Sequence, residues 1–264
     1  MQISGSTVLL TGATGGLGQA IARSLHRRGG KLILTGRRVD VLEPLAGELG
    51  GARTLAVDLS DRAAVDRLVA EAGEVDILVA NAALPGSGRL ESFTMEEIDR
   101  ALDVNLRAPI ALAHALVPGM VRRGRGHLSF MSSLSGKSPS PQTSIYNATK
   151  FGLRGFAGAL RADLREEGVE VSAVFPGFIR EAGMFSDSGT ELPPGVGTRS
   201  PQDVADAVVK AIERNRGEID VAPLPLRLGA AFSGLAPELA ATASRKMGAH
   251  KIASDLAAGS TSKR

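Results

Sequence analysis

The sequence predicts an α/β fold in which a doubly wound parallel sheet of about seven strands has helices on both faces. Strand-like and helix-like patterns alternate along most of the 264 residues, as in folds built from strand–helix–strand units. The run Val75–Ala80 is apolar at nearly every position, as expected where helices cover both sides of a strand. A glycine-rich turn also joins the first strand-like run to the first helix-like one.

Short runs rich in aliphatic and β-branched residues mark the expected strands. They lie at residues 7–11, 31–35, 54–57, 75–80, 127–132, 169–175 and 218–221. Between them, apolar residues recur three and four positions apart, which is typical of a helix with one buried face. These helices are expected at residues 17–28, 39–49, 62–72, 95–121, about 146–167 and 202–214, and Pro109 predicts a bend in the longest one. No linker or repeat divides the chain, so we expect a single domain over residues 1–264.

The composition excludes several kinds of site. The chain has no cysteine, which rules out disulfides, thiol nucleophiles and cysteine-bound zinc. Its four histidines are widely spaced, so we expect no metal site. The net charge is +3, but basic residues are mostly scattered among acidic ones and aromatic residues make up only 3% of the chain. We therefore expect no nucleic-acid partner.

The sequence also predicts a location. The N-terminus lacks the basic and apolar regions of a signal peptide. No uninterrupted apolar run approaches the ~20 residues of a membrane-spanning helix. We therefore expect the protein in the cytoplasm.

The first turn reads Thr11-Gly-Ala-Thr-Gly-Gly-Leu-Gly18 and lies between the first strand and the first helix. Its glycines let the backbone turn tightly and approach a ligand closely. The helix that follows offers free N–H groups and the positive end of its dipole to a pyrophosphate. A glycine-rich turn without a ligand is the alternative, and the position after the first strand disfavours it. The residues expected to bind the cofactor here are Thr11, Gly12, Thr14, Gly15, Gly16, Leu17 and Gly18.

A second motif lies in the stretch from Ser132 to Gly152. Tyr146, the only tyrosine, and Lys150 are four residues apart, which puts both on one face of a helix. A lysine cation beside a phenol favours the phenolate, so this pair predicts a tyrosine that exchanges a proton near neutral pH. Ser133 ends a strand-like run thirteen residues before Tyr146, and its hydroxyl is placed to bond a substrate oxygen. The pair alone is a weak signal, and Ser132 and Ser135 are neighbours with which Ser133 could share a structural role.

Together, the TGxxxGxG turn, Ser133 and the YxxxK motif resemble the short-chain dehydrogenase/reductase family over roughly residues 5–222. The resemblance implies a Rossmann fold and a nicotinamide cofactor that acts on alcohols and carbonyls. It also implies that Asn105 takes part in catalysis, through a proton relay that includes a water. Further positions that resemble cofactor-binding positions of the family are Asp58, Leu59, Asn81, Ala82, Ala83, Pro176, Gly177 and Ile179. Two positions depart from the family pattern: Ala83 stands where the family has glycine, and Glu181 where it often has threonine.

The residues after the second strand indicate which cofactor binds. A site for NAD(H) usually has an acidic residue there for the ribose 2′-hydroxyl, whereas an arginine suits the 2′-phosphate of NADP(H). Gly36 takes the place of the acid, and Arg37 and Arg38 follow it. These residues favour NADP(H) over NAD(H), because arginine pairs with phosphate through both charge and a planar fork of donors. Solvated arginines are the alternative.

The resemblance implies that Tyr146 acts as general acid or base, that Ser133 holds the reacting oxygen, and that Lys150 lowers the tyrosine pKa and binds the nicotinamide ribose. The expected function is NADP(H)-dependent interconversion of a carbonyl and an alcohol. A catalytically silent NADP(H)-binding regulatory or scaffold protein of the same fold is the alternative. A nucleotide-sugar epimerase or dehydratase is disfavoured, because such enzymes have a differently spaced glycine motif.

Two segments bear on substrate and partners. Residues 178–199 are expected to close over the substrate, and their apolar members suggest a lipid, steroid or retinoid-like compound. For the extension at residues 223–264 three roles are open: it caps the pocket, contacts a neighbouring subunit or touches a membrane surface. Small residues after Tyr146 favour close packing, and the resemblance implies a homodimer or homotetramer.

Overall fold

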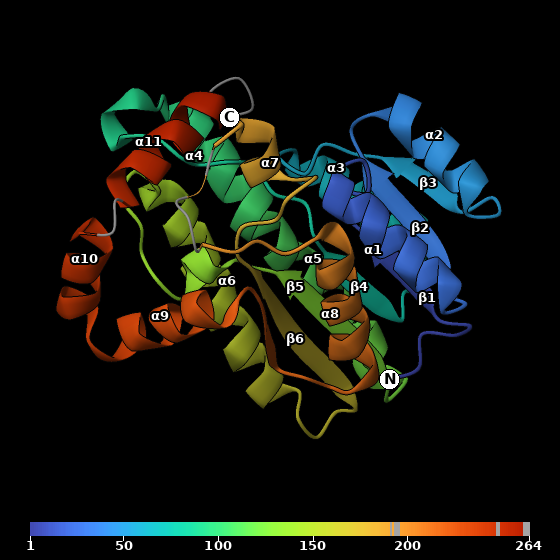
Figure 1. Ribbon diagram of the computed structural model, residues 1–264. Helices are drawn as coiled ribbons and strands as arrows, with labels where there is room; N and C mark the ends of the chain where they lie inside the picture. The colour runs from blue at the N-terminus through green and yellow to red at the C-terminus, as the bar shows by residue number, and fades with distance from the viewer. Residues whose placement is uncertain (191, 193–195, 247–248, 261–264) are drawn as a thin grey trace.

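The computed structural model describes residues 1–190, 192, 196–246 and 249–260. Its centre is one parallel sheet of seven strands in the order β3-β2-β1-β4-β5-β6-β7 (Figure 1), which confirms the predicted fold class. The strands are β1 (Thr7–Leu10), β2 (Lys31–Gly36), β3 (Arg53–Ala56), β4 (Ile77–Ala80), β5 (Gly126–Met131), β6 (Val169–Pro176) and β7 (Glu218–Val221). The strands begin and end within two residues of the predicted positions.

Helices cover the sheet on both faces and form two separate apolar clusters with it. Helices α1, α2 and α8 pack on one face, and α3, α5 and α6 on the other. The helices are α1 (Gly16–Arg27), α2 (Val39–Glu48), α3 (Arg62–Ala72), α4 (Met95–Leu102), α5 (Ala108–Arg122), α6 (Ser144–Asp163), α7 (Met184–Ser188), α8 (Pro201–Glu213), α9 (Leu224–Leu235), α10 (Pro237–Lys246) and α11 (Ala249–Ser260).

Local sequence explains where several helices begin. The side chain of Thr94 caps α4 and that of Ser200 caps α8, each in a reciprocal capping box with an acidic residue three positions later. Asp61 caps α3 by accepting a hydrogen bond from the N–H of Ala63 at 2.9 Å. These caps satisfy backbone donors that a helix cannot pair internally.

The predicted helix at residues 95–121 is two helices. A five-residue π-helical turn, Asp103–Arg107, separates α4 from α5. Pro109 lies in the first turn of α5, where its missing N–H costs no hydrogen bond, so the proline marks the restart of the helix and not a bend within it. By length and composition alone, Met95–Arg122 is the one stretch of the described residues that could cross a membrane. However, 44% of that window is buried, and α5 belongs to the core cluster on one face of the sheet.

The strand order places the carboxyl ends of β1 and β4 side by side. Leu10 pairs with Val79, and the N–H of Thr11 continues the ladder to the carbonyl of Val79 at 3.0 Å. The chain leaves these two strands toward opposite faces of the sheet, which opens a crevice at this edge. The loops at this edge contain most of the residues singled out in the sequence.

Candidate active site

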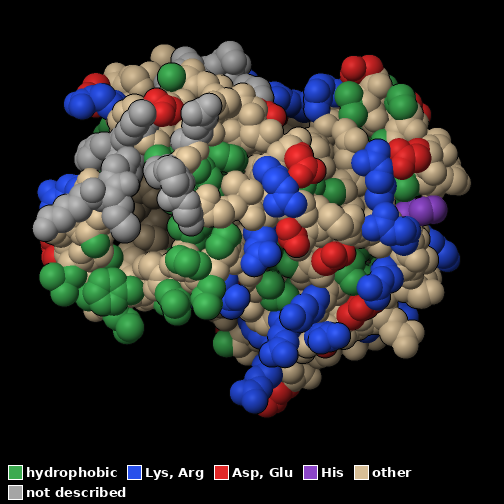
Figure 2. Space-filling view, in the orientation of Figure 1, with side chains coloured by type: hydrophobic (Ala, Val, Ile, Leu, Met, Phe, Trp, Pro, Cys, Tyr) green, Lys and Arg blue, Asp and Glu red, His purple; other side chains and the backbone are tan. Residues whose placement is uncertain are grey.

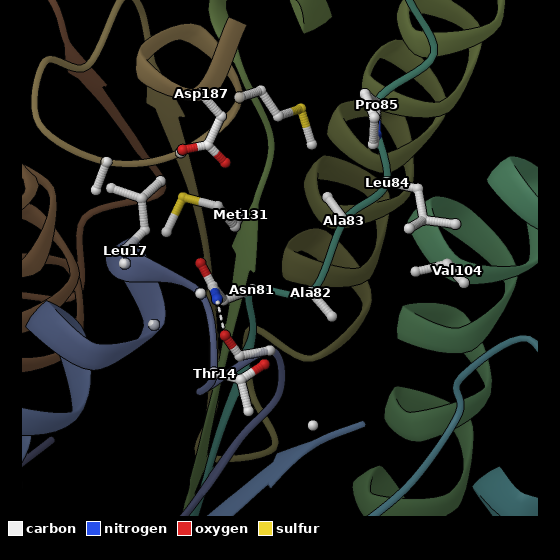
Figure 3. Close-up of a pocket in the computed structure, with 18 of the residues that line it drawn as sticks. Thr14, Leu17, Asn81, Ala82, Ala83, Leu84, Pro85, Val104, Met131 and Asp187 are labelled. Atoms are coloured by element: carbon white, nitrogen blue, oxygen red, sulfur yellow. Dashed lines mark hydrogen bonds between the residues drawn. The ribbon is translucent and has the colours of Figure 1, made fainter. Parts of the chain in front are cut away.

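A cavity of about 820 Å³ runs along the carboxyl edge of the sheet (Figure 3). This volume lies within the range of ~300–1,000 Å³ that is typical of ligand sites. The glycine loop, the loops after β2, β3, β4 and β5, and the segment after β6 form its walls. Every predicted catalytic or cofactor-binding residue lines the cavity, with two exceptions, Thr11 and Asn105.

The glycine loop forms a cradle that side chains would fill. Gly12 has a φ of +67°, and a Cβ there would come 2.7 Å from the Cα of Ala82. A Cβ at Gly18 would meet the carbonyl oxygen of Gly12 at 2.1 Å. The helix α1 begins at Gly16, so its first free N–H groups face the cavity. The loop thus has the shape and the donors that a pyrophosphate requires.

Thr11 acts beneath the cavity wall and not on it. Its buried Oγ1 accepts hydrogen bonds from the N–H groups of Asn81 (3.0 Å) and Ala82 (3.1 Å). In return, the amide of Asn81 donates to the carbonyls of Thr11 (3.1 Å) and Gly12 (3.2 Å). Figure 3 shows Asn81 reaching from the end of β4 to the glycine loop. These bonds fix the loop after β1 against the end of β4.

The two arginines after β2 have different partners. Arg38 donates to the carbonyl of Thr14 at 2.6 Å and so closes over the glycine loop. Arg37 is half-exposed and lies 4.0 Å from a carboxylate oxygen of Asp58, which Arg100 also approaches at 3.6 Å. Burial acts to raise the pKa of Asp58, but hydrogen bonds from Ser60 and the charges of Arg100 and Arg37 outweigh it and lower that pKa. This end of the cavity is therefore rich in positive charge.

Tyr146 and Ser133 both line the cavity, and the hydroxyl of Ser133 acts to lower the pKa of the phenol. Burial raises the pKa of Tyr146 to about 12, and the hydrogen bond with Ser133 only partly opposes that rise. Ser133 itself ends the segment after β5, where its Oγ accepts the N–H of Ser135 at 3.1 Å. The same hydroxyl donates to the carbonyl of Pro176 at 3.4 Å, so the ends of β5 and β6 meet at Ser133.

Lys150 follows Tyr146 by one turn of α6 and is buried. Its Nζ donates to the carbonyl of Met131 at 2.8 Å and lies 5.5 Å from the centroid of the Tyr146 ring. Burial lowers the pKa of Lys150 to about 7. The sequence predicts that the lysine lowers the tyrosine pKa, and in the protein alone burial has the opposite and larger effect. Desolvation of both groups dominates, so the phenol is a weaker acid and the ammonium a stronger one.

The structure separates the two adjacent serines. Ser132 is buried and donates to the carbonyl of Lys150 at 3.0 Å, which ties β5 to α6. Ser133 points to Tyr146, the partner that the thirteen-residue spacing predicts. The neighbouring serines thus have distinct bonds, one to the backbone of the helix and one to the phenol.

Asn105 lies in the π-helical turn between α4 and α5 and is fully buried. Its side-chain oxygen accepts the N–H of Leu84 at 2.6 Å, and its amide donates to the carbonyl of Leu84 at 2.9 Å. Leu84 lines the cavity. The side chain of Asn105 therefore positions the wall after β4, and it does not itself face the cavity.

The segment after β6 packs directly against the glycine loop. A Cβ at Gly16 would come 2.4 Å from the Cβ of Ala182. Glu181, which replaces the usual threonine, has a φ of +71° and pairs with Arg180 at 2.8 Å. Farther on, the residues Met184 and Phe185 that begin α7 line the cavity, while Phe178 stacks on Phe185 with centroids 5.1 Å apart. Of the predicted closing segment, residues 191 and 193–195 lie outside the described part.

The sequence did not indicate several cavity residues. Leu84, Pro85 and Val104 form an apolar wall on one side of the cavity, and Figure 3 shows Met131 and Asp187 of α7 on the other side. The C-terminal extension also reaches the cavity, because Gly259 of α11 lines it and α11 packs against α7. One of the three open roles of the extension, to cap the pocket, thus matches the structure. Among the described residues, no group of three or more His, Asp or Glu side chains could hold a metal.

Comparison with known proteins gives a consistent picture. Residues 6–192 match the family model described as short chain dehydrogenase. The ketoacyl reductase HetN of Nostoc sp. is 34% identical over 232 residues, which covers 85% of this chain and 81% of HetN.

Solved structures are similar too. A short-chain dehydrogenase from Sphingobium yanoikuyae in complex with NADPH has a TM-score of 0.77 at 29% identity, over 90% of this chain and 95% of that one. The 3-ketoacyl-(acyl-carrier-protein) reductase of Brucella melitensis, complexed with NADH, has a TM-score of 0.74 at 28% identity, over 83% and 98%. The family model, the sequence relatives and the fold agree with the motifs, and the chain belongs to the short-chain dehydrogenase/reductase family of oxidoreductases.

Proposed function

We propose that this protein is an NADP(H)-dependent oxidoreductase that interconverts a carbonyl and an alcohol, with Tyr146 as general acid or base. The observation that carries the proposal is that Tyr146, Ser133 and Lys150 line the same cavity as the glycine cradle, with the Lys150 ammonium 5.5 Å from the centroid of the phenol ring. A protein that only binds the cofactor has no need for a phenol and a hydroxyl held together beside a buried lysine.

The charges at one end of the cavity support NADP(H). Arg37 is half-exposed at the cavity wall and its Asp58 partner is 4.0 Å away, so its guanidinium is available to a 2′-phosphate. No acidic side chain occupies the Gly36 position, where a Cβ would meet Thr14 at 2.7 Å. The Sphingobium relative holds NADPH and the Brucella relative holds NADH, so residues of this chain must decide between the two cofactors.

When bound, NADPH supplies the hydride. Tyr146 protonates the developing alkoxide, and the hydroxyl of Ser133 donates a hydrogen bond to the same oxygen, which stabilises the transition state. Lys150 would hold the nicotinamide ribose through its hydroxyls and would provide a positive charge beside the phenol. A charged ammonium there would favour the phenolate and so lower the pKa of Tyr146. In the oxidative direction Tyr146 takes the proton.

The cavity lining supports an apolar substrate. The wall beside Tyr146 consists of Leu84, Pro85 and Val104, and Met184 and Phe185 contribute from α7. A Cβ at Gly86, next to this wall, would lie 3.0 Å from the backbone of Tyr146, so the wall is adjacent to the phenol. A lipid, steroid or retinoid-like carbonyl fits such a lining. Turnover restricted to small polar ketones or sugars would refute this part of the proposal.

Calorimetric titration with NADPH and NADH tests the cofactor. We expect much tighter binding of NADPH, weakened roughly 10- to 100-fold by Arg37→Ala through loss of charge-assisted bonds. Arg62→Ala is the matched control, because Arg62 is 76% exposed and does not line the cavity. Tighter binding of NADH would refute the role of Arg37.

A panel of aldehydes and ketones with NADPH tests catalysis. We expect turnover of at least one apolar carbonyl, and roughly a 10²- to 10⁴-fold loss of kcat in Tyr146→Phe. If NADPH binds but the wild type reduces no member of a broad panel, the catalytically silent regulatory or scaffold protein is the better function.

We further propose that the chain folds as one domain, is located in the cytoplasm and forms a homo-oligomer through α6. The exposed face of this helix includes Phe151, Gly155 and Gly158, and a Cβ at either glycine would meet nothing within 4 Å. A second α6 could therefore approach closely. Light scattering of Gly155→Trp, which would place a bulky ring on this face, tests the interface, and an unchanged mass would refute it.

A further inference from the structure

The C-terminal helices α9 and α10 expose a continuous apolar stripe. Its members are Leu224 (60% exposed), Leu228 (61%), Phe232 (46%), Leu235 (86%) and Leu239 (66%). Figure 2 shows hydrophobic side chains gathered over these two helices. Five of the ten large apolar side chains that are exposed in the described part of the chain belong to this stripe.

The four members of the stripe on α9 share one face of that helix. They are four, four and three residues apart, which is the interval that brings side chains together along a helix, and Leu239 follows on α10. The protein side of α9 is different, since its buried residues are Ala230 and Ser233. The large side chains of α9 in the stripe therefore keep much of their surface exposed, while small residues of this helix face the rest of the molecule. Contiguous apolar surface of this kind marks an interaction site in a folded protein.

The net positive charge of the protein lies in the same extension. Residues 223–264 contain six Lys or Arg residues and two Asp or Glu residues, so they carry a net charge of +4, whereas the whole chain carries +3. The remaining 222 residues are thus slightly negative. Two of the extension's arginines are described and exposed: Arg227 flanks the stripe on α9, and Arg245 lies near the end of α10.

We infer that α9 and α10 dock this protein on the surface of an anionic lipid bilayer. The leucines and Phe232 enter the boundary between headgroups and acyl chains, and Arg227 and Arg245 contact the anionic headgroups. Charge favours this occupant over a second copy of the chain, because two copies placed face to face would bring two net positive extensions together. The inference does not depend on the cofactor or on the catalytic residues.

Vesicle sedimentation of the full chain tests this. The vesicles contain phosphatidylglycerol and phosphatidylcholine in equal parts, or phosphatidylcholine alone. We expect the wild type to sediment with the anionic vesicles, to bind the neutral ones much more weakly, and to be released by high salt, which screens the attraction. Equal binding to both kinds of vesicle, or to neither, would overturn the inference.

Substitutions in the stripe provide the second part of the vesicle-binding test. Leu228→Glu combined with Phe232→Glu should reduce binding to anionic vesicles roughly 10-fold or more. Met95→Glu is the matched control, because Met95 is 64% exposed but lies on α4, and it should bind as the wild type does. Unchanged binding in the double variant would refute the inference. A dimer in the wild type that becomes a monomer in the double variant would show that a second copy covers the stripe, which also refutes it.

Discussion

The ammonium of Lys150 lies 5.5 Å from the centroid of the Tyr146 ring and donates a hydrogen bond to the carbonyl of Met131 at 2.8 Å. The two groups are therefore neighbours without a direct bond between them. Burial lowers the pKa of Lys150 to about 7 and raises that of Tyr146 to about 12. In the protein alone, the lysine is the group whose charge changes near neutral pH.

Lys150 should make stability depend on pH on the alkaline side. An unfolded lysine titrates near ~10.4, so between pH 7 and that value the unfolded chain holds a proton that the folded one lacks. Stability therefore rises with pH over this window, by up to about 1.4 kcal/mol per pH unit. Urea denaturation at several pH values from 7 to 9 should show this slope in the wild type and a flatter one in Lys150→Met. Equal slopes would contradict the prediction. Tyr146 does not interfere, because its raised pKa costs stability only above pH ~10.

The two adjacent serines should respond differently to removal of the hydroxyl. Ser133→Ala should lower kcat by roughly 10²- to 10³-fold, because it removes a hydrogen bond to the developing oxyanion, and should leave NADPH affinity unchanged. Ser132→Ala should instead lower the free energy of unfolding by about 1 kcal/mol, since it removes the bond to the carbonyl of Lys150. Steady-state kinetics and chemical denaturation of both variants check this. A larger loss of kcat in Ser132→Ala would reverse the assignment.

Asn147, the residue after Tyr146, should be a positioning residue for the loop before α6. Its buried amide donates to the carbonyls of Ser135 (2.5 Å) and Ser138 (3.3 Å), and its oxygen accepts the hydroxyl of Thr143. Asn147→Ala leaves these groups unpaired and should destabilise the protein by about 1–3 kcal/mol. Thermal unfolding checks this, with the exposed Ala148→Ser as a control. A Tm equal to that of the wild type would contradict it.

His127 should reduce stability in mild acid. It is fully buried on β5, with Nδ1 3.1 Å from Glu170 and Nε2 2.9 Å from the hydroxyl of Ser172. Burial lowers the pKa of His127, although the bond to Glu170 acts against this. The folded protein thus keeps the ring neutral, and stability falls as the pH drops through the unfolded value near ~6.5. Denaturation between pH 7.5 and 5 should show a flatter slope in His127→Gln than in the wild type. An equal slope would exclude this histidine as the cause.

Most of the fold could be predicted from the sequence, because the information is local. Seven short apolar runs and the helical spacing between them locate the strands and helices, and a parallel sheet follows from their alternation. The break at Asp103–Arg107 could not be predicted, because Asn105 there bonds to Leu84, a residue from a different loop. Because Leu84 is 21 residues away in the sequence, the residues around the π-helical turn contain no pattern that indicates this bond.

The candidate site shows the same limit. The glycine loop can be predicted from the spacing of glycines within one turn. The proximity of Tyr146 and Ser133 can be predicted from the spacing between a strand end and the next helix. The different partners of Arg37 and Arg38 cannot, because they depend on where Asp58 and the carbonyl of Thr14 come to lie. The protonation of Lys150 depends on burial by several elements at once, so its lowered pKa could not be predicted from the sequence.

The packing of α1 on α8 has a consequence for the nascent chain. Gln202 donates to the hydroxyl of Ser24 at 3.0 Å, and Arg28 pairs with Glu213 at 2.7 Å, so the first helix to leave the ribosome packs against a helix that is synthesised much later. Until residue 213 has been synthesised, the apolar face of α1 around Leu25 lacks its partner. During translation this face is open to chaperones and to aggregation, and truncation before α8 would leave it so permanently.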